Sequence, residues 1–206
     1  MNAERLRPLA QLPLSRLRGL RGVLTDIDDT LTQGGAIQPA ALHALHALAR
    51  AQLPVIAITG RPAGWSEPFA LAWPVAAIVA ENGAVVQRRE GASLQRDFTL
   101  DEATRARNFQ RLQLCAQAVL TQLPFTALAR DHAGRLTDIA IDPSEFRHLD
   151  AGQIAAVLSV MGRHGLNATV SSIHVNGWIA EHNKWSAARW AVEKAVRVPF
   201  LAADWL

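Results

Sequence analysis

The stretch Val23-Leu24-Thr25-Asp26-Ile27-Asp28-Asp29-Thr30-Leu31-Thr32 decides how the chain is interpreted, because three carboxylates follow directly on a short apolar run. The run favours a buried strand, and Gly34 and Gly35 favour a loop before the next helix. Carboxylates repel one another and resist burial, so such a cluster is tolerated mainly where it binds a cation, handles phosphate or transfers protons. An acidic surface turn is the simpler alternative, and the order of strand, polar loop and helix favours a site over it.

Four short segments together resemble the haloacid dehalogenase superfamily of phosphohydrolases. Residues 26–30 have the D-x-D-x-T form of the family's first motif, and Val55–Pro62 resembles the second motif, an apolar strand that ends in Thr. Lys184 opens a helix, as the family's lysine does. Glu81–Ala84 is similar to the Asn-Gly element of subclass IIB, which includes sucrose-phosphatase, mannosyl-3-phosphoglycerate phosphatase and Cof-like proteins. The resemblance runs from about residue 20 to the C-terminus.

The alternation of strands and helices predicts an α/β fold with a Rossmann-like parallel sheet core. The predicted strands of this core are Gly22–Thr25, Pro54–Thr59 and Val75–Val79, with helices at Pro39–Arg50, residues 63–72 and Lys184–Val196. Polar, alternating strands at Val85–Arg88 and Arg135–Ile141 then accompany two long helices. The resemblance implies that residues 85–170 form an inserted α/β cap, while 1–84 and 171–206 form a discontinuous core.

The resemblance assigns a chemical role to the residues of the motifs. Asp26 is implied to be the nucleophile that becomes an aspartyl phosphate, and Asp28 the acid that protonates the leaving alcohol and later deprotonates water. Thr59, Gly60 and Lys184 are implied to bind the phosphate and offset its charge. Asp26 and Asp28 are also implied to hold Mg²⁺, so the expected enzyme is a Mg²⁺-dependent phosphatase acting on a sugar or polyol phosphate.

Further polar residues are candidates for contact with the substrate. They are Arg61, Asn82, His174 and Asn176, of which Arg61 could equally anchor a neighbouring carboxylate. Arg130, His132 and Arg135 are weaker candidates of the same kind, most of which we expect to be ordinary surface residues. Asp29 stands where the family usually has Gly, and we expect its side chain to point away as a turn or capping residue.

The C-terminus departs from the family pattern. The superfamily's fourth motif is an apolar strand ending in Gly-Asp, with another Asp a few residues later, whereas this sequence ends Ala203-Asp204-Trp205-Leu206. Asp204 could be a degenerate metal ligand with Ala203 in place of the glycine. We favour the alternative that Trp205 and Leu206 begin the strand and that the sequence stops short of the motif, which would impair the activity of this chain.

Composition restricts the remaining possibilities. The 206 residues carry a formal net charge of +3 and are 50% hydrophobic and 19% charged, which is ordinary for a globular protein. The modest, scattered excess of positive charge suits a small phosphorylated metabolite and does not imply nucleic acid. Apolar runs are too short to span a membrane. The single cysteine, Cys115, excludes an internal disulfide, and Met1–Arg21 lacks a secretory signal, so we expect a cytoplasmic protein with a short extension on the first strand.

Other functions remain open at this stage. A phosphomutase of the same subclass would share all four motifs, and a protein that binds a phosphometabolite without turnover would suit the missing fourth motif. A dehalogenase needs no acid at Asp28. A receiver domain of bacterial signalling also combines Asp, Thr and Lys on a parallel sheet, but the D-x-D spacing and the insertion count against it.

Overall fold

The computed structural model describes residue 8 and residues 11–206. The prediction for Met1–Arg21 therefore lies partly outside the described residues. Within them the chain begins with the short helix α1 (Leu14–Arg18), which leads into strand β1 (Val23–Thr25). A small hairpin of β2 (Thr32–Gln33) and β3 (Ala36–Ile37) follows the acidic loop.

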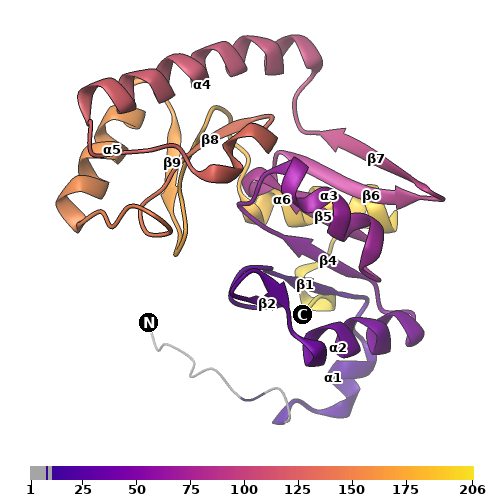
Figure 1. The fold of residues 1–206 in the computed structure, drawn as a ribbon. Helices are drawn as coiled ribbons and strands as arrows, with labels where there is room; N and C mark the ends of the chain where they lie inside the picture. Colours follow the sequence, from indigo (N-terminus) through magenta and orange to yellow (C-terminus); the bar gives the residue numbers. More distant parts are fainter. Residues whose placement is uncertain (1–7, 9–10) are drawn as a thin grey trace, which may run out of the picture.

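The main sheet lies right of centre in Figure 1, above α1 and α2. Among the described residues its strands are ordered β1, β4 (Val55–Ile58), β5 (Ala77–Ala80), β6 (Val85–Glu90) and β7 (Ser93–Phe98). β1, β4 and β5 are parallel, and β6 and β7 are antiparallel additions. Because β4 and β5 are buried along their whole length, they consist of apolar residues throughout. The predicted α/β core is confirmed, as a mixed sheet.

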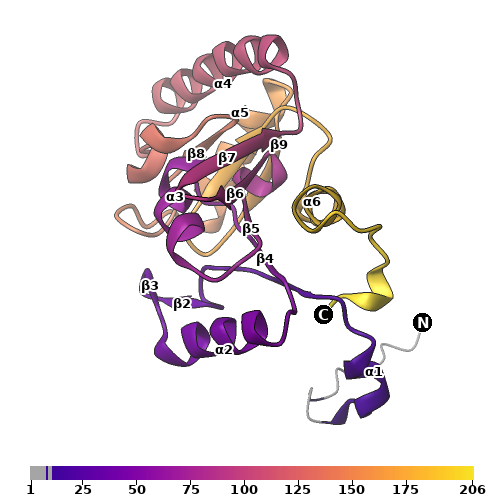
Figure 2. The ribbon, with the colours of Figure 1, turned by 90° about the vertical axis from the view of Figure 1, so that its right-hand side faces the viewer.

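Helices cover both faces of this sheet, as Figure 2 shows. α2 (Pro39–Arg50) and α3 (Ala63–Ala72) pack with Ile27 and Leu45 on one face. α6 (Lys184–Ala191) and its continuation η4 (Val192–Val196), a π-helical turn, pack on the other. Proline at the first position of α2 suits the helix start, because its missing N–H has no intrahelical partner there.

A three-stranded unit lies to the upper left of the main sheet in Figure 1. It consists of β8 (Asp138–Ile141), β10 (Val175–Trp178) and β9 (Asn167–Val170), paired antiparallel in that order, with α4 (Glu102–Gln122) and α5 (Ala151–Arg163) packed against it. The short turn η3 (Arg130–Gly134) precedes β8. Cys115 lies in the apolar core of this unit and is fully buried.

The strand predicted at Val85–Arg88 was assigned to the cap, and this placement is wrong. β6 pairs with β5 through Ile78 and Gln87, so β6 and β7 extend the core sheet. Alternating polarity identified a strand but not its partner, because a half-covered strand has the same pattern in either sheet. The main sheet therefore extends through Phe98, and β10, from the segment 171–206, belongs to the three-stranded sheet. The division of the chain into a core and an inserted cap stays a prediction.

The last residues form an additional partner for β1. Gly22 forms a parallel bridge with Trp205, and the Leu24 N–H donates to the Leu206 carbonyl at 2.8 Å. This agrees with the interpretation of Trp205 and Leu206 as the beginning of a strand. The main-chain carbonyl of Asp204 accepts from the Arg21 N–H at the amino end of β1, about 16 Å of strand away from Asp26 at roughly 3.3 Å per residue. Asp204 and Asp26 therefore lie beyond opposite ends of β1.

The helical spacing of Lys184–Val196 predicts that Trp185 shares a buried face with Ala188, Val192 and Ala195, and for Trp185 this is wrong. Its exposed fraction is 65%, and its ring meets Phe200 edge-on at 5.6 Å. The face of α6 that contacts the sheet consists instead of small residues, Ala187, Ala188 and Ala191, which allow a close approach. None of the helices in the described part of the chain is both long and apolar enough to cross a membrane.

Candidate active site

A cleft of about 260 Å³ opens between the carboxyl ends of the parallel strands and the three-stranded unit. Side chains from both parts line it: Asp26, Asp28, Gly60, Arg61, Asn82, Thr169, Val170, Ser171, Ser172, Ile173, His174, Asn176, Trp178, Asn183 and Lys184. Loops at the carboxyl ends of neighbouring strands converge in an open α/β sheet, which explains why residues so distant in sequence meet here.

Asp26 and Lys184 form an ion pair that lines the cleft. The Lys184 Nζ lies 2.8 Å from Asp26 Oδ2, and the other carboxylate oxygen accepts from the Ile27 N–H at 2.8 Å. Both side chains are nearly half exposed, at 46% and 44%. Asn183 caps α6 by accepting from the N–H groups of Trp185 and Ser186, which fixes Lys184 at the first position of the helix.

Asp28 is held much more tightly than Asp26. Its Oδ2 accepts from the Thr59 hydroxyl at 3.2 Å, and its Oδ1 accepts from the Arg61 Nε–H at 3.1 Å. The Thr59 hydroxyl also accepts from the Arg61 backbone N–H, so the turn after β4 closes on itself. The side chain of Asp28 is 18% exposed and that of Arg61 is 11% exposed. Both oxygens of this carboxylate therefore have fixed partners at the edge of the cleft.

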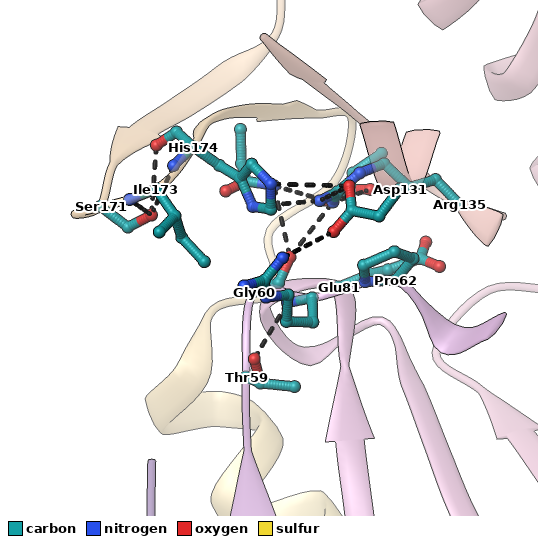
Figure 3. Close-up of polar contacts among 12 residues, drawn as sticks. Thr59, Gly60, Pro62, Glu81, Asp131, Arg135, Ser171, Ile173 and His174 are labelled. Atoms are coloured by element: carbon teal, nitrogen blue, oxygen red, sulfur yellow. Dashed lines mark hydrogen bonds and ion pairs between the residues drawn. The ribbon is translucent and has the colours of Figure 1, made fainter. Parts of the chain in front are cut away.

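A buried network continues from Arg61 into the three-stranded unit. Arg61 Nη1 lies 3.2 Å from Asp131 Oδ2, and Asp131 Oδ1 lies 3.2 Å from Arg135 Nη2. Arg135 Nη1 contacts both oxygens of Asp138 at 2.9 Å and donates to the Gly60 carbonyl at 3.1 Å. Figure 3 shows Asp131, Arg135 and His174 converging on the turn at Gly60. The sheet and the three-stranded unit are thus joined by charge-assisted contacts.

Glu81 forms a second link between the same two parts. It is fully buried and its carboxylate accepts from the backbone N–H groups of Ala63, Leu136 and Thr137. Glu81 and Asn82 have positive φ values of 52° and 55°, a backbone conformation that non-glycine residues adopt only when the surroundings enforce it. The side-chain amide of Asn82 lies beside the cleft, buried and without a hydrogen-bond partner among the described residues.

Burial and the neighbouring charges shift several pKa values in this network. Burial, reinforced by the Arg135 charge, lowers the pKa of His174 to about 4. Burial raises the pKa of Asp138 to about 7, against the effect of Arg135. Burial alone would raise the pKa of Asp131, but the neighbouring positive charges, above all that of Arg135, outweigh it, so the pKa is lowered. At neutral pH His174 is therefore an uncharged wall of the cleft.

The predicted site residues are placed together, with differences in detail. Asp26, Asp28, Gly60, Arg61, Asn82, His174, Asn176 and Lys184 all line the cleft. Thr59 lies beneath it, fully buried, with its hydroxyl turned to Asp28. Asn176 and His174 direct polar atoms to Asp138 and Arg135. Asp29 sits in a turn at φ 56° and accepts from the Ser172 hydroxyl.

Sequence reasoning missed Glu81, Asp131 and Asp138 and treated Arg135 as a substrate contact. Arg135 has an exposed fraction of 4%, and both of its Nη atoms are engaged by the network. No local pattern marks these residues, because their partners lie up to 75 positions away in the chain. The Glu-Asn-Gly run was noticed for its glycine and asparagine, although its glutamate makes most of the contacts.

The acidic residues of the cleft are candidate ligands for a divalent cation. No group of three or more His, Cys, Asp or Glu side chains is placed to hold a metal ion within residues 8 and 11–206. Asp26 nevertheless offers a half-exposed carboxylate at the cleft floor. One carboxylate with main-chain oxygens suits Mg²⁺, which commonly keeps several water molecules and binds substrate phosphate oxygens. The donor types therefore fit Mg²⁺, with the protein supplying only a few of its ligands.

Comparison with known families agrees with this geometry. Residues 23–123 match the family of haloacid dehalogenase-like hydrolases. No curated protein matches the sequence significantly. The matched segment contains the acidic loop, the turn after β4 and the Glu-Asn-Gly element, and the architecture is the α/β fold of that family.

Solved structures show the same fold at low sequence identity. The C-terminal domain of Candida albicans trehalose-6-phosphate phosphatase is similar with a TM-score of 0.61 and 13% identity, over 87% of this chain and 65% of that one. Plasmodium falciparum IMP-nucleotidase gives 0.62 and 11%, over 93% and 59%. A phosphatase of the haloalkanoate superfamily from Bacteroides thetaiotaomicron gives 0.59 and 17%, over 98% and 80%. The chain thus spans less than two thirds of the first two of these structures, and at these identities the likeness shows the fold.

Proposed function

We propose that the chain is a Mg²⁺-dependent phosphohydrolase of subclass IIB that cleaves the phosphate monoester of a small metabolite through an aspartyl-phosphate intermediate. A sugar or polyol phosphate is the proposed substrate class, and the cytoplasm is the proposed location. The cleft supports a small substrate, because about 260 Å³ accommodates a compact metabolite rather than a macromolecule. Nucleic acid is not part of the proposal.

The observation that carries this proposal is the contact of 2.8 Å between Lys184 Nζ and Asp26 Oδ2 at the floor of the cleft. A carboxylate can attack a phosphate dianion only if positive charge offsets the repulsion between them. Lys184 supplies such a charge from the start of α6. Asn82 supports the same interpretation, because its buried side-chain amide has no partner in the described structure and can donate to a phosphate oxygen.

The proposed reaction has two displacement steps at phosphorus. Asp26 Oδ forms a bond to phosphorus while the ester P–O bond breaks, and Asp28 donates a proton to the departing oxygen. In the second step Asp28 takes a proton from water as that water attacks phosphorus. The bond between phosphorus and Asp26 then breaks, which releases inorganic phosphate and restores both carboxyl groups.

Magnesium would be held by the carboxylate of Asp26 and the main-chain carbonyl of Asp28. When bound, such an ion supplies positive charge that neutralises the phosphate oxygens. The contributions of the chain itself are separate: Lys184 binds and orients the phosphate, and the turn at Gly60 brings a small residue against the cleft. An ideal Cβ at Gly60 would lie 3.1 Å from Asn82 Oδ1, so this position favours glycine.

The test is phosphate release from a panel of phosphorylated sugars, polyols and glycerates, with p-nitrophenyl phosphate as a general substrate. Activity should depend on Mg²⁺ and disappear in Asp26→Asn. Asp29→Asn is the matched control, because it removes a neighbouring carboxylate whose side chain points to Ser172, and it should keep most of the activity. Transfer of phosphate to a second hydroxyl would indicate a phosphomutase, and tight binding without release would indicate a binding protein.

A further inference from the structure

The carboxylate of Asp28 is held by hydrogen bonds at both of its oxygens. Thr59 occupies one carboxylate oxygen and Arg61 the other, at 3.2 and 3.1 Å. An acid or base works only when its oxygen lies within hydrogen-bond reach of the reacting atom, so its orientation limits the rate. Whatever fixes Arg61 therefore also fixes the orientation of Asp28.

Arg61 is itself held by two carboxylates and an aromatic ring. Its Nε donates to Asp28, its Nη1 donates to Asp131 at 3.2 Å, and its guanidinium lies 5.0 Å from the ring centroid of Trp65. A planar guanidinium held by two carboxylates and an aromatic face has little freedom to reach for a phosphate. This places Arg61 with the carboxylates, one of the two roles that its sequence position left open.

Asp131 connects Arg61 to the three-stranded unit. It comes from η3, 70 positions along the chain from Arg61, and its second oxygen contacts Arg135 at 3.2 Å. Arg135 is fixed in turn by Asp138 and by the Gly60 carbonyl. A continuous set of charge-assisted contacts therefore runs from the buried centre of the molecule to the edge of the cleft.

We propose that Arg61 and Asp131 are positioning residues for the acid/base step: Arg61 holds the carboxylate of Asp28 toward the cleft, and Asp131 of the three-stranded unit holds Arg61. This inference rests on the proposed function for its kinetic part. It assigns neither residue to contact with the substrate. It also makes the acid/base step depend on the seating of the three-stranded unit against the sheet.

The kinetic test compares Asp131→Asn in the wild-type and Asp28→Asn backgrounds. In the wild-type background kcat for an alkyl phosphate should fall about 10- to 100-fold, the usual effect of losing an outer-shell partner, with KM little changed. The loss should be small for formation of the phosphoenzyme from p-nitrophenyl phosphate, whose leaving group needs no proton. In the Asp28→Asn background the same substitution should add no further loss.

Two further variants make the test specific. Asp131→Glu keeps the carboxylate charge and should have a higher kcat than Asp131→Asn. Arg61→Lys should have a kcat as low as that of Arg61→Gln, because one ammonium cannot contact both carboxylates. Glu67→Gln removes one partner of the exposed Arg96 ion pair and serves as the control, with unchanged kinetics. A loss that persists in the Asp28→Asn background, or a raised KM with unchanged kcat in Arg61→Gln, would overturn the proposal.

A crystal structure of Asp131→Asn keeps the inference testable if the wild type hydrolyses none of the substrates. That outcome would remove the proposed function but not the positioning claim. Displacement of the Arg61 guanidinium and the Asp28 carboxylate from the contacts described above would support it. Unchanged positions of both groups would overturn it, since Asp131 would then not hold Arg61.

Discussion

The two halves of the candidate site differ in how firmly they are held. Asp26 and Lys184 contact each other at the cleft floor with nearly half of each side chain exposed. Asp28, Arg61, Asp131 and Arg135 lie in a network whose side chains are between 1% and 18% exposed. Exposed ion pairs contribute little to stability, whereas breaking a buried pair leaves an uncompensated charge. Substitutions of Asp26 or Lys184 should therefore change catalysis alone, and substitutions in the buried network should change both catalysis and stability.

The largest effect is expected at Asp26. Asp26→Asn should reduce turnover of every substrate to background, because the amide cannot attack phosphorus. Its thermal unfolding midpoint should stay close to that of the wild type, since the lost ion pair is exposed. Steady-state kinetics and calorimetry on the same preparation test both points, and substantial residual turnover would exclude Asp26 as the nucleophile.

Asp28 should show a smaller and substrate-dependent effect. Asp28→Asn should slow hydrolysis of an alkyl phosphate by roughly 10²- to 10⁴-fold, the usual contribution of general acid–base catalysis. In single-turnover measurements phosphoenzyme formation from p-nitrophenyl phosphate should be affected least. Equal losses for the two substrates in that step would contradict the assignment of Asp28 as the acid.

Replacing Arg135 and Lys184 in turn by methionine tests whether the buried network contributes more to the free energy of unfolding than the exposed ion pair. Arg135→Met leaves Asp131 and Asp138 without their buried partner and should lower the free energy of unfolding by about 3–5 kcal/mol. Lys184→Met removes an exposed partner and should change it by less than about 1 kcal/mol while activity falls. Urea denaturation monitored by tryptophan fluorescence measures both. Similar losses in the two variants would mean that burial does not separate the two halves.

A smaller, pH-dependent effect is expected at His182, which is buried and stacked on Trp178 at 5.8 Å. Burial lowers its pKa from 6.5 to about 4. Between these values the unfolded chain binds a proton that the folded protein does not, so the free energy of unfolding falls as the pH drops from 6.5 toward 4. The full effect is on the order of 3 kcal/mol, and it is nearly absent above pH 7.

His182→Phe keeps an aromatic ring beside Trp178 and removes the titration. The difference in unfolding free energy between pH 7 and pH 5 should therefore be smaller in the variant than in the wild type. His174, whose pKa is also lowered to about 4, retains its own share of the dependence in both proteins. An identical pH dependence in the two proteins would show that His182 is not buried in its neutral form.

The same contrast explains what could be predicted from the sequence. Asp26 and Asp28 follow directly on an apolar strand, and Lys184 follows its capping residue, so local pattern was enough to find them. The partners of Arg61 and Glu81 come from segments 70 and 55 positions away, and no periodicity encodes such pairings. β6 was predicted as a strand but placed in the wrong sheet, because pattern gives the face of a strand and not its neighbour, and β7 was not predicted.

The central claim, that Asp26 becomes phosphorylated, can be tested by trapping the intermediate. Asp28→Asn should accumulate it with p-nitrophenyl phosphate, because the first step needs no acid for this leaving group while hydrolysis of the acyl phosphate lacks its base. Reduction of the acyl phosphate with borohydride, followed by peptide mass spectrometry, locates the modified residue. The account predicts modification at Asp26, and release of nitrophenol with modification at another residue, or with none, would contradict it.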